Sequence, residues 1–334
     1  MSKSAQSFPT TCLHTIKTHN GPVNAVIFSS SPGTYLLTGS SDRDVHLCRA
    51  VPPPSNSASP NPVTTSPIQK YEAHGYSVLD LAVTADNARF VSVGGDKQVF
   101  LWDVETGSTV RRWSGHDARV EAVEFGGEAD SVVVSGSADT TVRIWDTRSL
   151  TSKPMQTLAE ATDTVSSVHV HMPSCSIVSG SYDGRIRTYD LRMGIVKVDV
   201  MGHPVTSIRC SADGNALLAS CLDGRIRMVD RADGSVLKSF GGGSGGAGGR
   251  PTYKNTELRI RSSFAKDDSA VISGSEPGDG NPEAHVFAWD ILSGDVIGCV
   301  PTGEDVKVVS CVAWNEKGKN WAAGCSNGSV LVFG

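Results

Sequence analysis

A six-residue offset that recurs seven times along the chain constrains its fold more than any other feature. In each occurrence a turn residue, acidic or amide, is followed six positions later by an aromatic or apolar residue that ends an alternating strand. The pairs are Asp42–Cys48, Asp96–Trp102, Asp139–Trp145, Asp183–Tyr189, Asp223–Val229, Glu283–Trp289 and Asn327–Phe333. Alternation with a period of two, broken by short turn-rich stretches, indicates antiparallel β-structure. Because strands this short cannot bury their apolar faces alone, the repeated units must pack against one another.

The spacing of the units identifies the architecture. Four of the six intervals between successive turn residues span 40 to 44 residues, and the clearest unit, 115–146, opens with Gly-His and closes with Trp-Asp. This period and these marks are the signature of the WD-repeat propeller, which has four strands in each blade. We therefore predict an all-β, seven-bladed WD-repeat β-propeller that occupies the whole chain, 1–334, as a single domain.

The two longer intervals hold insertions that lie between predicted strands. Segment 51–67 is rich in Pro, Ser and Asn, and segment 241–250 is almost all Gly and Ser, so we expect both to be disordered or flexible. A shorter insertion, 276–282, lengthens a hairpin turn in the sixth unit. The last unit ends after its third strand, whereas the strand at 12–17 precedes the first unit. We predict that this N-terminal strand completes the last blade and closes the ring.

Composition narrows the classes of partner. The net charge is −5 and the isoelectric point is about 6.0, so no general attraction to nucleic acid exists. We expect no direct DNA binding, RNA contact that is peripheral at most, and no membrane association, because no apolar run reaches transmembrane length. The expected state is a monomer that works within larger assemblies.

His, Ser, Asp and Trp recur together in the second and third units. The sets are His74, Ser92, Asp96 and Trp102, and His116, Ser135, Asp139 and Trp145. A Ser-His-Asp set suggests a nucleophilic triad and hence a hydrolase. Catalysis needs one such set, however, whereas a hydrogen-bond network that holds blades together needs one in every blade. We interpret both sets as structural tetrads, and we predict no catalytic, cofactor-binding or metal-ligating residue and no cofactor.

Five arginines are candidates for partner binding. Arg143, Arg187 and Arg227 each lie four places after a turn acid, a pattern that places them on equivalent strand faces as a basic strip for an acidic partner segment. The alternative, which we favour, is that they are solvated or paired between blades. Arg148 and Arg192 end two W/Y-D-x-R boxes, at 145–148 and 189–192. This box looks like the one by which many WD-repeat substrate receptors dock on the cullin-4 ubiquitin ligase adaptor.

Four stretches resemble one particular group of propellers. They are HGYSVLDLAV (74–83), GGDKQVFLWDVETGSTVRRWSGH (94–116), DTVSSVHV (163–170) and GSYDGRIRTYDLRMG (180–194). These stretches resemble the mitogen-activated protein kinase organiser family of WD-repeat proteins, which is also found among spliceosome components. The resemblance runs from about residue 13 to the end and is closest over 71–230.

The resemblance implies a non-enzymatic scaffold that mediates protein–protein interactions. Its implied partners are splicing factors of pre-mRNA splicing complexes and components of a MAP kinase cascade, in the nucleus and the cytoplasm. The alternative function is that of a substrate receptor that docks on the cullin-4 adaptor through its two W/Y-D-x-R boxes.

Overall fold

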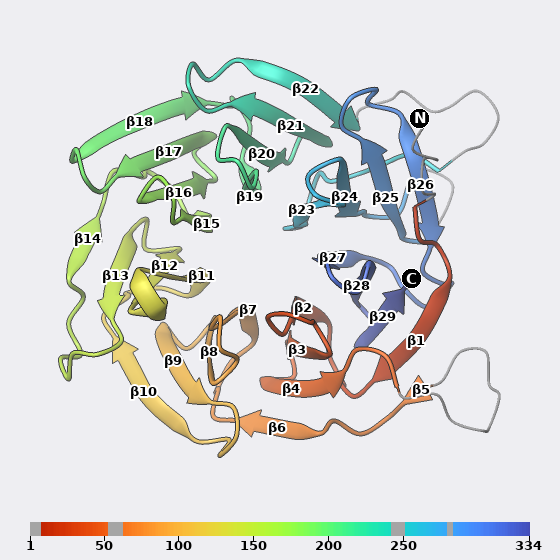
Figure 1. Cartoon of the computed structure of the whole chain (residues 1–334), viewed down its shortest axis with the longest axis horizontal. Helices are drawn as coiled ribbons and strands as arrows, with labels where there is room; N and C mark the ends of the chain where they lie inside the picture. The colour runs from red at the N-terminus through yellow and green to blue at the C-terminus, as the bar shows by residue number, and fades with distance from the viewer. Residues whose placement is uncertain (1–7, 53–62, 242–250, 279–282) are drawn as a thin grey trace.

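Seven β-sheets stand radially around a common axis in the computed structural model, which describes residues 8–52, 63–241, 251–278 and 283–334 (Figure 1). Six of these sheets have four strands and the seventh has five. The described residues contain one short 3-10 turn, η1 (Glu128–Asp130), and no α-helix. The predicted all-β, seven-bladed propeller is confirmed. In the described part of the chain, no helix has the length and apolar character needed to cross a membrane.

Each blade runs from an innermost strand to an outer strand in chain order. The first blade holds β2 (Val23–Phe28), β3 (Tyr35–Ser40), β4 (Asp44–Arg49) and β6 (Gln69–Glu72). The second holds β7 (Val78–Val83), β8 (Arg89–Gly94), β9 (Gln98–Asp103) and β10 (Thr109–Ser114). The third holds β11 (Val120–Gly126), β12 (Val132–Ser137), β13 (Val142–Asp146) and β14 (Gln156–Leu158). The fourth holds β15 (Val165–His171), β16 (Ser176–Ser181), β17 (Arg185–Asp190) and β18 (Ile195–Val200).

The last three blades follow the same order, with one change at the ring closure. The fifth blade holds β19 (Val205–Cys210), β20 (Ala216–Cys221), β21 (Arg225–Asp230) and β22 (Val236–Gly241). The sixth holds β23 (Ser262–Ala265), β24 (Ala270–Gly274), β25 (His285–Asp290) and β26 (Val296–Pro301). The seventh holds β27 (Val309–Asn315), β28 (Asn320–Cys325) and β29 (Ser329–Phe333), followed by β1 (Cys12–Lys17) and β5 (Val63–Thr64).

A glycine in the second strand allows neighbouring blades to pack closely. At Gly136 and Gly180, an added Cβ would lie 2.7 and 2.8 Å from Cγ1 of Val165 and Val205, which begin the innermost strands of the following blades. Real Cβ atoms do not approach so closely, so any side chain here would force the blades apart. The repeated Ser-Gly-Ser and Thr-Gly-Ser motifs therefore reflect blade-to-blade packing.

The N-terminal strand closes the ring as predicted. β1 pairs antiparallel with β29, with Thr15 opposite Leu331 and Ile16 opposite Val330. Ile16 and Val330 are buried in an apolar cluster that also includes residues of the first blade. This arrangement ties the first and last repeats together. Without β1, the last blade would have three strands and an open edge on β29.

The expectation that all of 51–67 is disordered or flexible is wrong for Val63 and Thr64. Val63 and Thr64 form β5, which pairs in parallel with Thr15 and Ile16 of β1, and Thr64 Oγ1 lies 2.8 Å from His14 Nε2. Backbone pairing with the outer edge of β1 thus orders these two residues, although the neighbouring sequence is polar. Residues 53–62 and 242–250 of the two predicted insertions, and 279–282 of the shorter one, lie outside the described residues.

Candidate functional site

The structure brings the side chains of each tetrad into contact. In the second blade Trp102 Nε1–H donates to Ser92 Oγ (2.8 Å), Ser92 Oγ lies 2.7 Å from His74 Nε2, and His74 Nδ1 lies 2.5 Å from Asp96 Oδ2. Because a carboxylate only accepts, Nδ1 carries the imidazole proton and Nε2 accepts from the serine hydroxyl. The third blade repeats these three contacts, each at 2.8 Å, among His116, Ser135, Asp139 and Trp145.

This order of hydrogen bonds is that of a nucleophilic triad, so accessibility decides what the tetrads can do. Ser92 and Ser135 are fully buried, and an indole N–H already occupies one lone pair of each hydroxyl oxygen. A nucleophile must reach a substrate, and neither hydroxyl is open to one. The tetrads instead leave no buried donor unmatched, which suits an internal brace of the blade.

The carboxylates of the tetrads are held in their charged form. Burial alone would raise the pKa of Asp96, but hydrogen bonds from His74 and from the Gly75 N–H (2.8 Å) outweigh it, so the pKa lies below its ordinary value. Asp139 follows the same rule, with burial opposed by its bonds to His116 and Thr141. Ionised carboxylates make the strongest acceptors for these buried donors.

Other blades satisfy the turn acid in different ways. In the first blade His19 bridges Asp42 (2.9 Å) and Thr38 (2.8 Å), and Cys48 replaces the tryptophan. His46, at the strand position that Phe100 holds in the second blade, stacks on His19 with ring centroids 3.9 Å apart. Burial, together with the neighbouring His19, lowers the pKa of His46 to about 4. His46 is therefore neutral at physiological pH.

The basic strip predicted from Arg143, Arg187 and Arg227 is not presented to a partner. Arg187 is only 1% exposed, and its guanidinium binds both oxygens of Asp183, at 2.7 and 3.3 Å. Arg227 binds Asp223 in the same way, and Arg143, also mostly buried, lies 3.7 Å from Asp139. The assignment of these three arginines to partner binding is therefore corrected. Each pairing occurs within one blade and not between blades, because an arginine four places after the turn aspartate reaches back to that aspartate.

The two box arginines, in contrast, are open to solvent. The Arg148 side chain is 77% exposed, with Nε 3.8 Å from Asp146, and it follows the third strand of its blade. Arg192 holds the equivalent place after β17, is exposed, and donates from Nη2 to the Pro173 carbonyl oxygen at 2.9 Å. Both remain candidates for partner binding.

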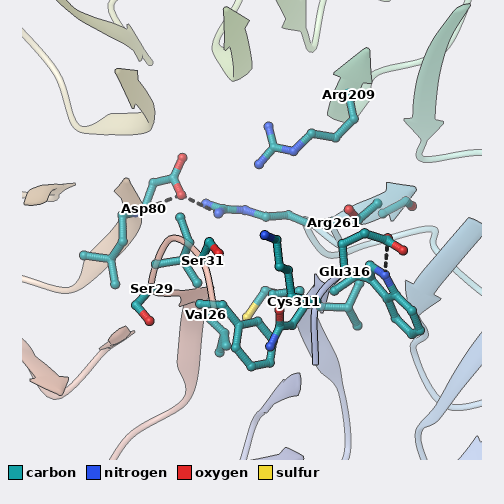
Figure 2. A pocket seen from close by; sticks show the side chains of 18 residues that line it. Val26, Ser29, Ser31, Asp80, Arg209, Arg261, Cys311 and Glu316 are labelled. Atoms are coloured by element: carbon teal, nitrogen blue, oxygen red, sulfur yellow. Dashed lines mark hydrogen bonds and ion pairs between the residues drawn. The ribbon is translucent and has the colours of Figure 1, made fainter. Parts of the chain in front are cut away.

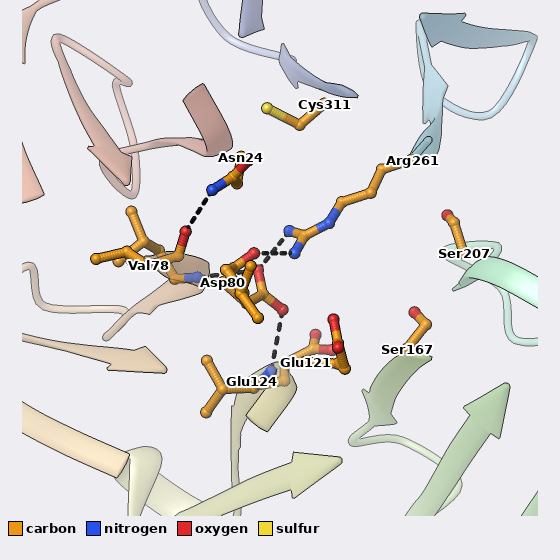
Figure 3. Close-up of polar contacts among 12 residues, drawn as sticks. Asn24, Val78, Asp80, Glu121, Glu124, Ser167, Ser207, Arg261 and Cys311 are labelled. Carbon is orange, nitrogen blue, oxygen red and sulfur yellow. Dashed lines mark hydrogen bonds and ion pairs between the residues drawn. The ribbon is translucent and has the colours of Figure 1, made fainter. Parts of the chain in front are cut away.

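A charged bridge that the sequence analysis missed crosses the centre of the ring. Arg261, just before β23 in the sixth blade, reaches Asp80 on β7 of the second blade, and its Nη2 also donates to the Leu79 carbonyl oxygen at 2.6 Å (Figure 3). Asp80 Oδ2 in turn accepts the backbone N–H of Val123 at 3.0 Å. The bridge therefore joins three blades at the axis of the ring.

A second ion-pair chain lies beside it. Arg259 Nη1 is 3.2 Å from Glu121 Oε2, and Glu121 Oε1 accepts from Arg119 Nε at 2.5 Å. Arg259 and Arg261 both belong to the stretch that directly precedes β23. Nearby, Glu276 is buried and accepts the backbone N–H groups of Thr256, Glu257 and Leu258, the last at 2.7 Å. In place of Glu283, Glu276 thus acts as the turn acid of the sixth blade.

The innermost strands of four blades share one polar contact with the next blade. In four blades the residue after the first position of the strand donates to a backbone carbonyl of the next blade: Asn24 to Val78 (2.8 Å), Ser166 to Val205 (2.5 Å), Thr206 to Ile260 (3.1 Å) and Ser310 to Val23 (2.6 Å). In the second and third blades Leu79 and Glu121 stand at this place, and in the sixth blade Arg261 directly precedes β23. Aligning the innermost strands of the seven units would have exposed the exceptions.

Two cavities flank the bridge, and Arg261 lines both. One, of about 330 Å³, also contains Asp80, Arg209 and Cys311 in its wall (Figure 2). The other, of about 420 Å³, is lined by Arg119, Glu121 and Arg259 among others. Burial raises the pKa of the Cys311 thiol, which disfavours a nucleophilic thiolate. In the described residues no group of three or more His, Cys, Asp or Glu side chains is placed to hold a metal ion.

Known proteins resemble this chain in both sequence and repeat pattern. The family described as the nucleolar protein 10-like N-terminal domain matches residues 77–247, and the WD domain, G-beta repeat family matches 10–48. WD repeat domain-containing protein 83 of Rattus norvegicus is 39% identical over 302 residues, which cover 90% of this chain and 86% of that protein. The human protein of the same name is 39% identical over 294 residues (88% and 83%), and its homolog in Dictyostelium discoideum is 29% identical over 313 residues (86% and 87%).

The seven closed blades and their repeated braces define a WD-repeat β-propeller, a class that serves as a platform for protein interactions. The chain belongs to the family of WD repeat domain-containing protein 83. This finding corrects the family name given from the sequence resemblance. The matching relatives are not named after a kinase organiser, and a matching family is the nucleolar protein 10-like one, so no kinase-organising role follows from the match.

Proposed function

We propose that this chain is a non-enzymatic scaffold whose partners are proteins of pre-mRNA splicing complexes, in the nucleus and the cytoplasm. One observation carries the non-enzymatic part: the serines of both Ser-His-Asp sets are fully buried within their blades. Family membership supports the scaffold role, and the acidic isoelectric point of about 6.0 favours protein over RNA as the point of contact. Support for splicing proteins as the partners comes from the stretches 74–83, 94–116, 163–170 and 180–194, which resemble spliceosome-associated WD-repeat proteins.

Affinity purification of the tagged full-length chain from nuclear and cytoplasmic fractions tests this proposal. We expect splicing factors to be enriched in the nuclear fraction relative to a tagged, unrelated propeller. Retention of the same partners after nuclease treatment is also expected, because the contacts are between proteins. A nuclear fraction without splicing factors would refute the splicing role, and kinase-cascade components in the cytoplasmic fraction would reassign the partners.

The exposed arginines of the two W/Y-D-x-R boxes favour a second candidate, a substrate receptor of the cullin-4 ligase. Arg148 and Arg192 occupy equivalent exposed places in consecutive blades, so one flat partner surface can contact both. The test is co-purification with the cullin-4 adaptor, followed by its loss in the variant Arg148→Glu/Arg192→Glu. Lys153→Glu, an exposed change in the same loop as Arg148, is the matched control. Equal adaptor recovery with both variants would eliminate this candidate.

A further inference from the structure

The outer strand of the fourth blade exposes an unusual row of apolar side chains. β18 is the free edge of its sheet, in the order β15-β16-β17-β18. Its exposed fractions are 56% for Ile195, 38% for Val196, 46% for Val198 and 70% for Val200. An exposed, apolar edge strand offers both unpaired backbone groups and side chains that favour strand pairing.

No other blade has this feature at the same register. Val198 and Val200 lie opposite Arg187 and Arg185 of the third strand. The residues equivalent to Val198, read from the strand pairings, are Thr15, Lys70, Arg112, Thr157, Ser239 and Cys299. Those equivalent to Val200 include Lys17, Glu72, Ser114, Gly241 and Pro301. Charged residues and proline are the usual protection of an edge strand against pairing, and β18 lacks them at both places.

Another blade of this protein shows that an outer strand can accept an added strand. On the seventh blade the equivalent outer strand, β1, already carries an added strand, because β5 pairs with it in parallel at Thr15 and Ile16. Thr15 is the equivalent of Val198. The rim of this propeller therefore has room for a fifth strand at this register, and on the fourth blade that place is free in the described residues.

Charge at the two ends of β18 identifies the kind of occupant. Arg192 lies in the turn before β18, and Arg185 lies opposite Val200 at its other end; both are exposed, and neither forms an ion pair among the described residues. A second copy of this chain, paired through its own β18, would bring these arginines together and be repelled. A strand with acidic ends would be attracted instead.

We propose that β18 binds an extended segment of a partner protein by β-strand addition, and that this segment has apolar residues at alternate positions and an acidic residue near each end. Backbone hydrogen bonds to the free edge supply affinity, while Val196, Val198 and Val200 contact the alternate side chains of the segment. The inference deepens the scaffold function proposed above and rests on it, since it assigns one surface to one class of partner.

Fluorescence anisotropy with a labelled synthetic peptide tests the surface directly. The probe alternates valine with threonine over six positions and carries an aspartate at each end. We expect saturable binding to the full-length chain and at least about tenfold weaker binding to Val198→Lys, because the lysine removes an apolar contact and blunts the edge. Ser239→Lys, at the same register on β22, is the matched control and should bind as the unmodified chain does.

Several outcomes would overturn the proposal. They are equal affinity of the Val198→Lys and Ser239→Lys variants, absence of saturable binding, or equal affinity for a peptide with lysines in place of the aspartates. Val198→Thr, which keeps the strand propensity, provides a second variant should the lysine variant melt at a lower temperature, and it should bind more weakly than the unmodified chain. Light scattering that detects a dimer abolished by Val198→Lys would assign the edge to a second copy instead.

Purification of the same variants separates this inference from the function on which it rests. If the chain is a scaffold and β18 is a docking edge, Val198→Lys loses some partners that Ser239→Lys retains. Identical partner sets for both variants would refute the docking edge alone. A full-length unmodified chain that recovers no specific partner would refute the scaffold function itself.

Discussion

Replacing Asp139 by alanine tests whether the tetrads are braces. Asp139 accepts from His116 Nδ1 (2.8 Å), from the Asp117 N–H (3.0 Å), and from the N–H and hydroxyl of Thr141 (3.0 and 2.6 Å). The His116 side chain is completely inaccessible, whereas the Asp117 N–H is exposed and Thr141 is only part-buried. Water can therefore replace the carboxylate at the exposed donors but not at the imidazole.

The expected cost follows from that difference. One fully buried donor left without an acceptor destabilises a protein by about 1–3 kcal/mol, and donors that water can reach add little. The imidazole would also lose the bond that fixes its tautomer, which weakens the contact of Nε2 with Ser135. We expect the Asp139→Ala variant to lose about 2–3 kcal/mol of unfolding free energy.

Urea unfolding followed by tryptophan fluorescence and circular dichroism measures this loss. Asp96→Ala is the matched variant, because Asp96 makes the same contact with His74 in the second blade, and it should lose a similar amount. Asp117→Ala is the control: the Asp117 side chain is 90% exposed, so its removal should change the unfolding free energy by less than about 0.5 kcal/mol.

A different pattern would refute the brace. Catalytic groups usually cost stability, so an active-site role predicts that one of the two aspartate variants is at least as stable as the unmodified chain. If Asp139→Ala and Asp96→Ala both change stability as little as Asp117→Ala, the two tetrads do not hold their blades together, and their interpretation as braces fails.

Three further predictions concern closure, the central bridge and pH. Ile16→Ala, within the strand that closes the ring, should cost about 2–5 kcal/mol, measured by urea unfolding, because Ile16 is fully enclosed; an unchanged midpoint would contradict closure through β1. Asp80→Ala should cost about 3–5 kcal/mol by leaving Arg261 unpaired, whereas adding Arg261→Leu should recover part of that loss; additive losses in this double-mutant cycle would contradict the bridge. Burial alone would raise the pKa of Asp183, but the hydrogen bonds from Arg187 outweigh it, so this pKa lies below its ordinary value of 3.8. A lowered pKa in the folded state stabilises the protein above that pH, and the contribution is lost as pH falls through the folded pKa. Thermal unfolding below pH 3.8 should therefore depend less steeply on pH in Asp183→Asn.

The features that could be predicted from the sequence are those that repeat. A fixed offset before a strand end, repeated seven times, identifies the blades, although the turn acid of the sixth blade is Glu276 and not Glu283. A strand left over at one end, with a place missing at the other, identifies the closure. The contacts within a tetrad are local to a blade, so His116 and Asp139 can be matched from residue types and spacing alone.

Features that depend on position around the ring could not be predicted in this way. Asp80 and Arg261 are far apart along the chain and meet only because the seven blades close into a ring, so that both face its axis. The partner of Arg187 could not be named for a related reason: spacing places Arg187 on a strand face but does not say that Asp183 lacks a histidine partner and accepts the guanidinium instead. β5 was missed because two residues of ordinary composition pair only when a particular edge lies beside them.

Recurrence also separates bracing from binding in a propeller. A brace recurs from blade to blade, since each blade has a turn to stabilise, and Arg187 recurs as Arg227, each paired with the turn aspartate of its own blade. A contact with another protein needs to occur only once. Val198 has no aliphatic counterpart in any other blade. Its exposed side chain lowers solubility and does not improve the packing of its own blade. A costly residue that appears once, on an exposed strand edge, is better explained by a partner than by the fold.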